Sequence, residues 1–163
     1  MNRDLIEKYA VSGEKVAMAI RGLTREDLLW IPPADADPGI GRWSIQQVVI
    51  HLLDSDLIAM DRIKRMIAME NPPLVGYDED LFIHRLMPHE QSAEDAIKIL
   101  DLSFKNCANV LRKLPAAVFE SKGMHNERGA TTAGEYIGYM VAHTDHHLKF
   151  IHAKRAVMGK EMW

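Results

Sequence analysis

The stretch from Tyr139 to Ile151 constrains the fold of this chain more than any other. It contains neither proline nor glycine, so a helix is predicted, and it carries His143 and His147 four residues apart. On a helix this spacing stacks the two side chains on one face, about one turn apart. Tyr136 and Met140 share that face, so both imidazoles point into an apolar stripe. An unpaired polar group costs roughly 1–3 kcal/mol there, and a metal ion is one candidate partner.

Apolar residues recur at helical spacing in three further long segments. Two of the long segments begin with a capping box, a local signature of a helix start, formed by Ser44 with Gln47 and by Thr132 with Glu135. The predicted helices are four long ones at 4–23, 44–69, 92–114 and 132–157, and two short ones at 24–30 and 78–86. No segment shows convincing β alternation. The pattern therefore predicts an all-α fold, a four-helix bundle.

The connections between these helices differ in length. Residues 31–42 and 115–131 are rich in glycine, proline or charged residues, and loops are predicted there. The connection 70–91 is longer than a tight hairpin needs, which predicts a crossover between the second and third long helices. The length of 163 residues suits a single domain spanning 1–163.

Composition excludes several classes of protein. The net charge is −3, from 20 basic and 23 acidic residues, which disfavours nucleic-acid binding. No run of about 18 apolar residues is present, so no membrane span is expected. The first residues lack the apolar core of a signal peptide, and the single cysteine, Cys107, forms no intrachain disulfide. A cytoplasmic protein is the expectation.

A third histidine completes a candidate metal site. Catalytic zinc is commonly held by three protein ligands with a fourth position open. His51 lies deep inside the predicted helix 44–69, at the border of its apolar stripe, whereas the remaining histidines lie in loops, in a short helix or on the opposite helix face. The sequence therefore predicts His51, His143 and His147 as metal ligands. The alternative is that the spacing arose by chance and that all three are packing residues.

Other residues could assist such a site or serve packing alone. Asp56 falls near the centre of an apolar stripe, where it orients a ligand, acts as a base, or pairs with a histidine or arginine of a neighbouring helix. The segment 77–79 lies in the long connection that could cover the site, although turn chemistry also explains it. Cys107 is expected to pack as a small buried residue. Trp163 fits either an exposed tail or a dimer contact.

Two motifs resemble those of a known family. Trp43-Ser44 with His51-Leu52, followed about ninety residues later by the pair of histidines, is similar to the motifs of the DinB-like (DinB/YfiT) superfamily. The resemblance implies a four-helix bundle that holds a divalent metal, commonly zinc or nickel, on His51, His143 and His147, and homodimers are common among its members. Many members carry a glutamine after the last histidine pair, where this chain has Lys149-Phe150.

Three functions are compatible with these features. The resemblance, together with three neutral ligands, favours a metal-dependent S-transferase in which a low-molecular-weight thiol attacks a small-molecule substrate. A metal-dependent hydrolase is the alternative within the enzyme class. A non-catalytic, metal-stabilised binding module is the third, because no clear acid–base pair accompanies the triad.

Overall fold

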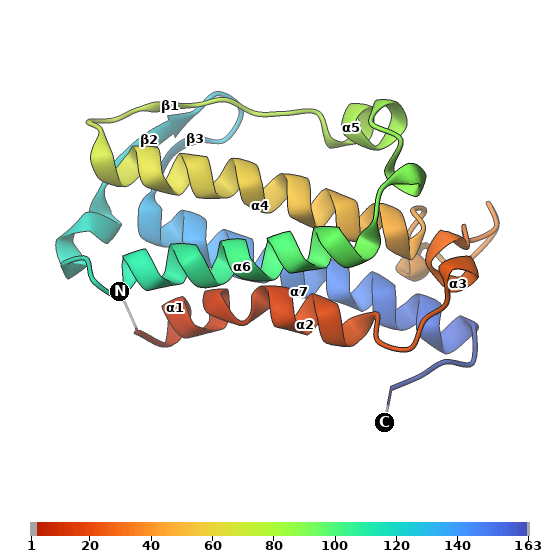
Figure 1. Ribbon diagram of the computed structural model, residues 1–163. Coiled ribbons are helices and arrows are strands. Elements are labelled where there is room, and N and C mark those ends of the chain that lie inside the picture. Colours follow the sequence, from red (N-terminus) through yellow and green to blue (C-terminus); the bar gives the residue numbers. More distant parts are fainter. Residues whose placement is uncertain (1–2, 163) are drawn as a thin grey trace.

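Helices dominate the computed structural model, which describes residues 3–162 (Figure 1). The helices are α1 (Arg3–Ala10), α2 (Ser12–Ala19), α3 (Arg25–Leu29), α4 (Ile45–Ala68), α5 (Glu79–Arg85), α6 (Ala93–Leu111) and α7 (Ala133–Val157). Short 3₁₀ turns lie at Pro38–Ile40, Pro88–Glu90 and Ala116–Glu120. The strands are β1 (Pro73–Leu74), β2 (Lys122–His125) and β3 (Gly129–Thr132). No helix within 3–162 combines the length and the apolar character that crossing a membrane requires.

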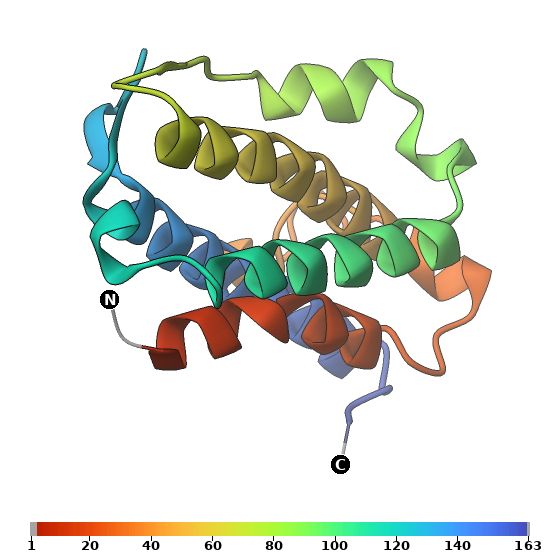
Figure 2. The ribbon, with the colours of Figure 1, turned by 60° about the vertical axis from the view of Figure 1, so that its left-hand side comes forward.

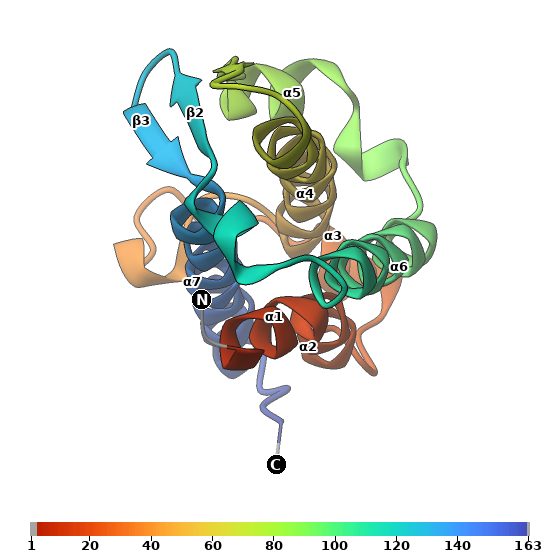
Figure 3. The same cartoon turned by 90° about the vertical axis from the view of Figure 1, so that its left-hand side faces the viewer.

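Seen end-on, the bundle has four columns, with α1 and α2 together forming one of them (Figure 3). α4 packs against α6 and α7, and the α1–α2 column packs against the same two helices. The chain directions in Figure 1 show that α4 and α6 run parallel to each other, and that α7 runs parallel to the α1–α2 column. Parallel neighbours need a connection that returns along the bundle, and the segment containing β1 and α5 is that connection (Figure 2). The predicted four-helix bundle with a crossover is confirmed.

The predicted caps mark where the long helices begin. The side chain of Ser44 accepts a hydrogen bond from the backbone of Gln47, whose own side chain accepts from the backbone of Ser44. The same reciprocal pair joins Thr132 and Glu135 at the start of α7. Each box satisfies two backbone N–H groups that a helix start leaves free.

The first predicted helix, 4–23, is divided in the structure into α1 and α2 at Val11. The hydroxyl of Ser12 donates to the carbonyl of Lys8, 3.1 Å away. A serine that bonds back to the preceding turn in this way often bends a helix. The apolar residues of both halves still face the core, so the column is kept.

The prediction that residues 115–131 form a loop without strands was wrong. β2 and β3 pair antiparallel around a three-residue loop, and β1 adds to β2 in parallel, giving the order β1-β2-β3. Gly129 follows that loop with a φ of +78°, a conformation that glycine adopts without strain. Strands of two to four residues are too short to show alternation in the sequence.

Candidate metal centre

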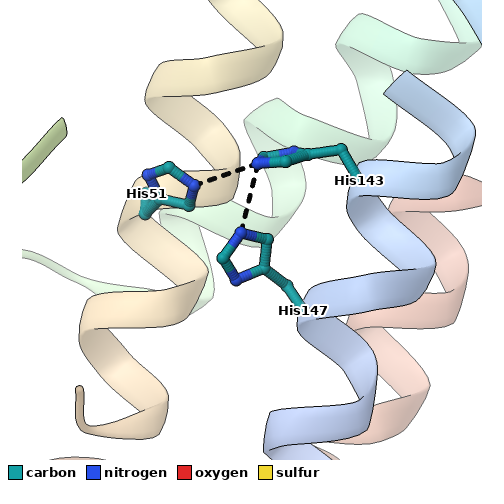
Figure 4. A group of neighbouring side chains, drawn as sticks. All are labelled: His51, His143 and His147. Atoms are coloured by element: carbon teal, nitrogen blue, oxygen red, sulfur yellow. Dashed lines mark hydrogen bonds between the residues drawn. The ribbon is translucent and has the colours of Figure 1, made fainter. Parts of the chain in front are cut away.

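α4 and α7 bring the three predicted histidines together. Ser44 fixes the start of α4, so His51 falls two turns into that helix, and α7 supplies His143 and His147 from its middle. Figure 4 shows the three rings facing one another between the two helices. His51 is only 2% exposed, and the other two are partly buried. The side chains singled out by spacing and stripe position therefore converge at one point.

The distances within the triad suit a metal ion. The Nε2 atom of His143 lies 3.2 Å from that of His51 and 3.1 Å from that of His147. The candidate ligand atoms of all three lie within 4.8 Å of one another. Around a tetrahedral zinc ion with bonds of about 2.0–2.1 Å, neighbouring ligand atoms are about 3.3–3.4 Å apart. The donor set therefore has the type, and along two of its three edges nearly the spacing, that a tetrahedral divalent ion requires.

Hydrogen bonding within the triad does not satisfy these rings. Both short contacts use the same atom, Nε2 of His143. A neutral imidazole nitrogen carries either one hydrogen or one lone pair, so it cannot make two full hydrogen bonds. The Nδ1 atoms of His143 and His147 are buried and have no hydrogen-bond partner within residues 3–162. A cation held by the three Nε2 lone pairs would remove the competition for Nε2 of His143 and would leave the ring protons on Nδ1.

The surroundings keep all three imidazoles neutral. Burial, reinforced by the neighbouring His143, lowers the pKa of His51 to about 3. Burial lowers the pKa of His143 to about 4, with His146 and Arg128 contributing. Burial also lowers the pKa of His147 to about 2, with the other two rings of the triad contributing. Because a ligating imidazole must be unprotonated, these shifts keep the lone pairs available at neutral pH.

Two aromatic residues border the triad. The Trp43 ring lies parallel to that of His147, with centroids 6.3 Å apart, and 5.0 Å from the ring of His51. The Tyr139 ring stacks on that of His143, with centroids 5.8 Å apart. Aromatic contacts of this kind restrict how the imidazoles can rotate, so the rings are held in their converging orientation.

A pocket of about 490 Å³ opens onto the triad. His143 and His147 form part of its wall, and aromatic rings and charged groups of both signs form the rest. The charged residues are Arg42, Glu79, Asp80, Arg128 and Lys154. Lys154 donates to the carbonyl of Ile40, and burial lowers its pKa to about 8. The volume lies within the range of small-molecule sites.

Among residues 3–162, Glu79 is the only one with a carboxylate oxygen within 4.0 Å of a triad nitrogen. It is the first residue of α5, and its Oε2 lies 4.0 Å from Nε2 of His51. Burial and the neighbouring Asp80 raise its pKa, while Arg128 opposes the shift. Of the two readings of segment 77–79, Glu79 fits the first by lying in the pocket wall, and Asp78 fits the second, because it caps α5 by accepting from the backbone of Leu81.

Asp56 is a structural residue. It is fully buried, and its carboxylate accepts hydrogen bonds from the hydroxyls of Tyr9, at 3.1 Å, and Ser103. The predicted histidine or arginine partner was wrong, because two neutral hydroxyls take that place. Burial raises the pKa of this carboxyl to about 6. Cys107 is buried within α6, as expected of a packing residue, and Trp163 lies outside the described residues.

The remaining histidines do not join the triad. His89 pairs with the hydroxyl of Ser44 at 2.9 Å, and His125 is buried in β2. His146 and His152 are exposed on α7. Spacing singled out none of the charged pocket residues, and Glu79 was named only for its place in the long connection. These residues come from segments that are distant in the chain, so their proximity is a property of the fold.

The fold and the triad define a class: a helical bundle with three imidazoles converging from two helices at an open pocket. Comparison with known families identifies the group within that class. Residues 9–151 match the sequence model of the DinB superfamily. This chain therefore belongs to the DinB superfamily.

Two individual proteins and one solved structure are similar to this chain. A protein of Oceanobacillus iheyensis named "putative metal-dependent hydrolase" is 32% identical over 111 residues, which are 68% of this chain and 64% of that protein. A Bacillus mycoides protein of the same name is 28% identical over 160 residues, 95% of this chain and 88% of its own length. The structure of YfiT from Bacillus subtilis, described as a probable metal-dependent hydrolase with an unusual four-helix bundle topology, superposes with a TM-score of 0.86 at 23% identity. That match covers 96% of this chain and 86% of YfiT.

Proposed function

We propose that this protein is a metal-dependent hydrolase acting on a small molecule. His51, His143 and His147 would hold a divalent ion, with zinc or nickel suiting imidazole ligands. The observation that carries the proposal is the convergence of three neutral Nε2 atoms, 3.1–3.2 Å apart along two edges, beside an open pocket. The printed names of the relatives from Oceanobacillus and Bacillus point in the same direction.

The chemistry divides between the ion and the chain. A bound divalent ion with three neutral ligands keeps its full charge and lowers the pKa of water from 15.7 to about 7. Glu79, on the pocket wall, would accept the proton of the attacking water at Oε2. The raised pKa of Glu79 lies nearer to the working pH than that of an ordinary glutamate. Trp43 and Phe150 form apolar wall on the same pocket and exclude part of the bulk solvent.

The thiol transferase implied by the family resemblance stays a prediction. The same neutral triad would also lower the pKa of a low-molecular-weight thiol, and nothing in the wall of the pocket selects sulfur over oxygen. Glu79 can take the proton of either nucleophile, so the preference for hydrolysis rests on the printed names of the relatives. The homodimer also stays a prediction, and light scattering of the purified protein tests it.

Metal content is the first test. We expect stoichiometric zinc or nickel in the wild-type protein and in His152→Ala, whose histidine is exposed on the same helix. His147→Ala should lose the ion while remaining folded by circular dichroism. Equal metal content in His147→Ala and His152→Ala would contradict the proposed ligand set.

Turnover is the second test. Metal-loaded and metal-stripped protein are compared on a panel of esters and amides, and in parallel on electrophiles offered with low-molecular-weight thiols. We expect metal-dependent hydrolysis, with kcat lowered about 10²- to 10⁴-fold in Glu79→Gln at unchanged metal content. Glu94→Gln, an exposed carboxylate on α6, is the control. Thiol conjugation without hydrolysis would establish the transferase instead, and a chelation-sensitive melting temperature without any turnover would favour a binding module.

A further inference from the structure

A second, smaller cavity adjoins the metal centre. It has a volume of about 50 Å³ and lies between α4, α7 and the β2–β3 hairpin. Away from the triad its walls include Arg62, His125 and Tyr136, and its residues shared with the larger pocket are Glu79, Arg128, Tyr139 and His143. A molecule bound at the triad can therefore extend into it.

Arg62 brings to this cavity a positive charge that forms no ion pair within residues 3–162, although the carboxylates of Glu79 and Glu127 also line the wall. Arg62 is only 8% exposed, its Nη1 donates to the hydroxyl of Tyr136 at 2.7 Å, and its Nη2 donates to the carbonyl of Val75. Its Nε is buried without a partner within residues 3–162. Buried guanidinium groups are normally paired, because the isolated charge is costly to desolvate.

His125 adds a second donor to the same cavity. The side chain is 4% exposed, and its Nδ1 accepts from the backbone N–H of Glu127 at 3.2 Å. A neutral ring that accepts at Nδ1 carries its hydrogen on Nε2, so that atom is a donor. Arg128, from the hairpin loop, lies over the Tyr139 ring at 4.4 Å and supplies a further cation on the wall shared with the larger pocket.

We propose that this cavity binds a carboxylate group of the substrate, with Arg62 as its principal partner. The inference rests on the proposed function, since it places the reacting group of the same molecule at the triad. A cavity of 50 Å³ holds a few water-sized groups, which is the size of a carboxylate. A planar guanidinium fork is the side chain best matched to a carboxylate. Substrates are therefore small acids whose carboxylate stands a short distance from the bond that is cleaved.

The larger pocket and this cavity together form one elongated site, and its two ends then have separate roles. Arg62 and His125 lie at the end away from the triad, where Arg128 adds a second cation and Glu127 one carboxylate, whereas Glu79 lies at the triad and offers an acceptor. A carboxylate next to Glu79 would be repelled, and one next to Arg62 would be stabilised, so the charges orient the substrate in one direction. Esters or amides without an additional free carboxylate should be poorer substrates than analogues that carry one.

Binding to metal-free protein tests the proposal without relying on turnover. Sodium acetate is titrated into nitrogen-15-labelled, metal-free protein, with sodium chloride at equal ionic strength as the reference, and the Nε–H signal of Arg62 is followed by NMR. We expect a saturable shift of this signal and of the His125 ring signals with acetate only. Arg62→Met should weaken acetate binding about 10- to 100-fold, which is the range for hydrogen bonds to charged groups.

Two further variants control for folding and for general charge. Arg65→Met removes an exposed cation three residues along α4, paired with Asp61, and should leave acetate binding unchanged. Arg62→Lys keeps the charge without the fork and should bind acetate with intermediate affinity, which gives a readout if Arg62→Met does not fold.

The remaining outcomes would overturn the proposal. They are shifts no larger with acetate than with chloride, equal acetate affinity in wild type and the Arg62 variants, or tighter binding of inorganic phosphate than of acetate at the same signals. Because the protein is metal-free in this experiment, such a result leaves the proposed hydrolase standing. Conversely, saturable acetate binding at Arg62 in a protein without hydrolytic turnover would refute only the hydrolase.

Discussion

Two kinds of buried polar residue occur within this bundle, and hydrogen bonding separates them. The carboxylate of Asp56 is fully buried but accepts from Tyr9 and Ser103, so its burial is compensated within the chain. His51 and His147 both contact one atom, Nε2 of His143, and the Nδ1 atoms of His143 and His147 have no partner in the part of the chain that the structure describes. A group satisfied by the chain has a structural role, whereas a group that the chain leaves unsatisfied indicates a ligand.

The raised pKa of Asp56 predicts a pH-dependent contribution to stability. The folded carboxyl has a pKa of about 6, against an ordinary value of 3.8, so between these values the folded state holds a proton that the unfolded state has lost. Its stabilising contribution is therefore full below about pH 4 and is lost as the pH rises through about 6. The loss is on the order of 2 kcal/mol across that window.

Asp56→Asn isolates this contribution, because the amide does not titrate. The measurement is the free energy of unfolding by urea at pH 4, 5, 6 and 7 for both proteins. The advantage of wild type over Asp56→Asn should shrink as the pH rises. Taking the difference between the two proteins removes the contribution of the histidines to the free energy of unfolding, because they titrate in both. A difference that is flat or grows with pH would show that the carboxylate is bound ionised.

Among single residues, periodicity identified those that share a helix face and missed those that meet across the fold. His143 and His147 are one turn apart, and His51 lies at the border of an apolar stripe, so all three were predictable. Arg62 also lies on α4, but its meaning depends on the Tyr136 hydroxyl and on a hairpin 60 residues away. No rule of spacing in the sequence connects these groups, because only the folded chain brings them together.

At the level of elements, one close contact between helices depends on a glycine. A Cβ atom at Gly13 of α2 would lie 2.5 Å from Cα of Asp101 in α6, a backbone atom that cannot move alone. Gly13→Ala should therefore lower the melting temperature although alanine is the better helix former, because overpacking costs about 1–3 kcal/mol and the gain in helix propensity is about 1 kcal/mol or less.

Gly138 provides the matched control for that substitution. It lies within α7, and an added Cβ would meet only the side chain of Leu5 at 3.9 Å, an ordinary contact. Gly138→Ala should raise the melting temperature, because the unfolded chain loses freedom and no clash arises. Differential scanning calorimetry of both variants measures the effects, and a rise for Gly13→Ala would show that α2 and α6 are not packed as closely as the structure indicates.

Element boundaries were predictable where a side chain marks them. The boxes at Ser44 and Thr132 located the starts of α4 and α7, the two helices that carry the triad. The bend at Val11 was missed because the apolar periodicity continues through it. The hairpin was missed because β2 and β3 are each four residues long, and β2 depends on pairing with β1, about 50 residues earlier.

For the whole molecule, the crossover has a functional consequence. Because α4 and α6 run parallel, the chain must return along the bundle, and that return carries α5 to the end of α4 where His51 lies (Figure 1). Glu79 reaches the triad only through this path. The long connection and the composition of the site therefore have one origin, the order in which the four columns are connected.

Metal binding should stabilise the whole bundle, since the ion would join α4 to α7. A ligand bound only by the folded state at 100 times its Kd stabilises by about 2.7 kcal/mol, and for a chain of this length each kcal/mol raises the melting temperature by about 2–4 °C. We therefore expect zinc or nickel to raise the melting temperature of the stripped protein by about 5–11 °C. His51→Ala should abolish the rise, and His152→Ala should retain it. If His51→Ala responded as fully as wild type, the ion would be bound elsewhere and α4 would not be part of the centre.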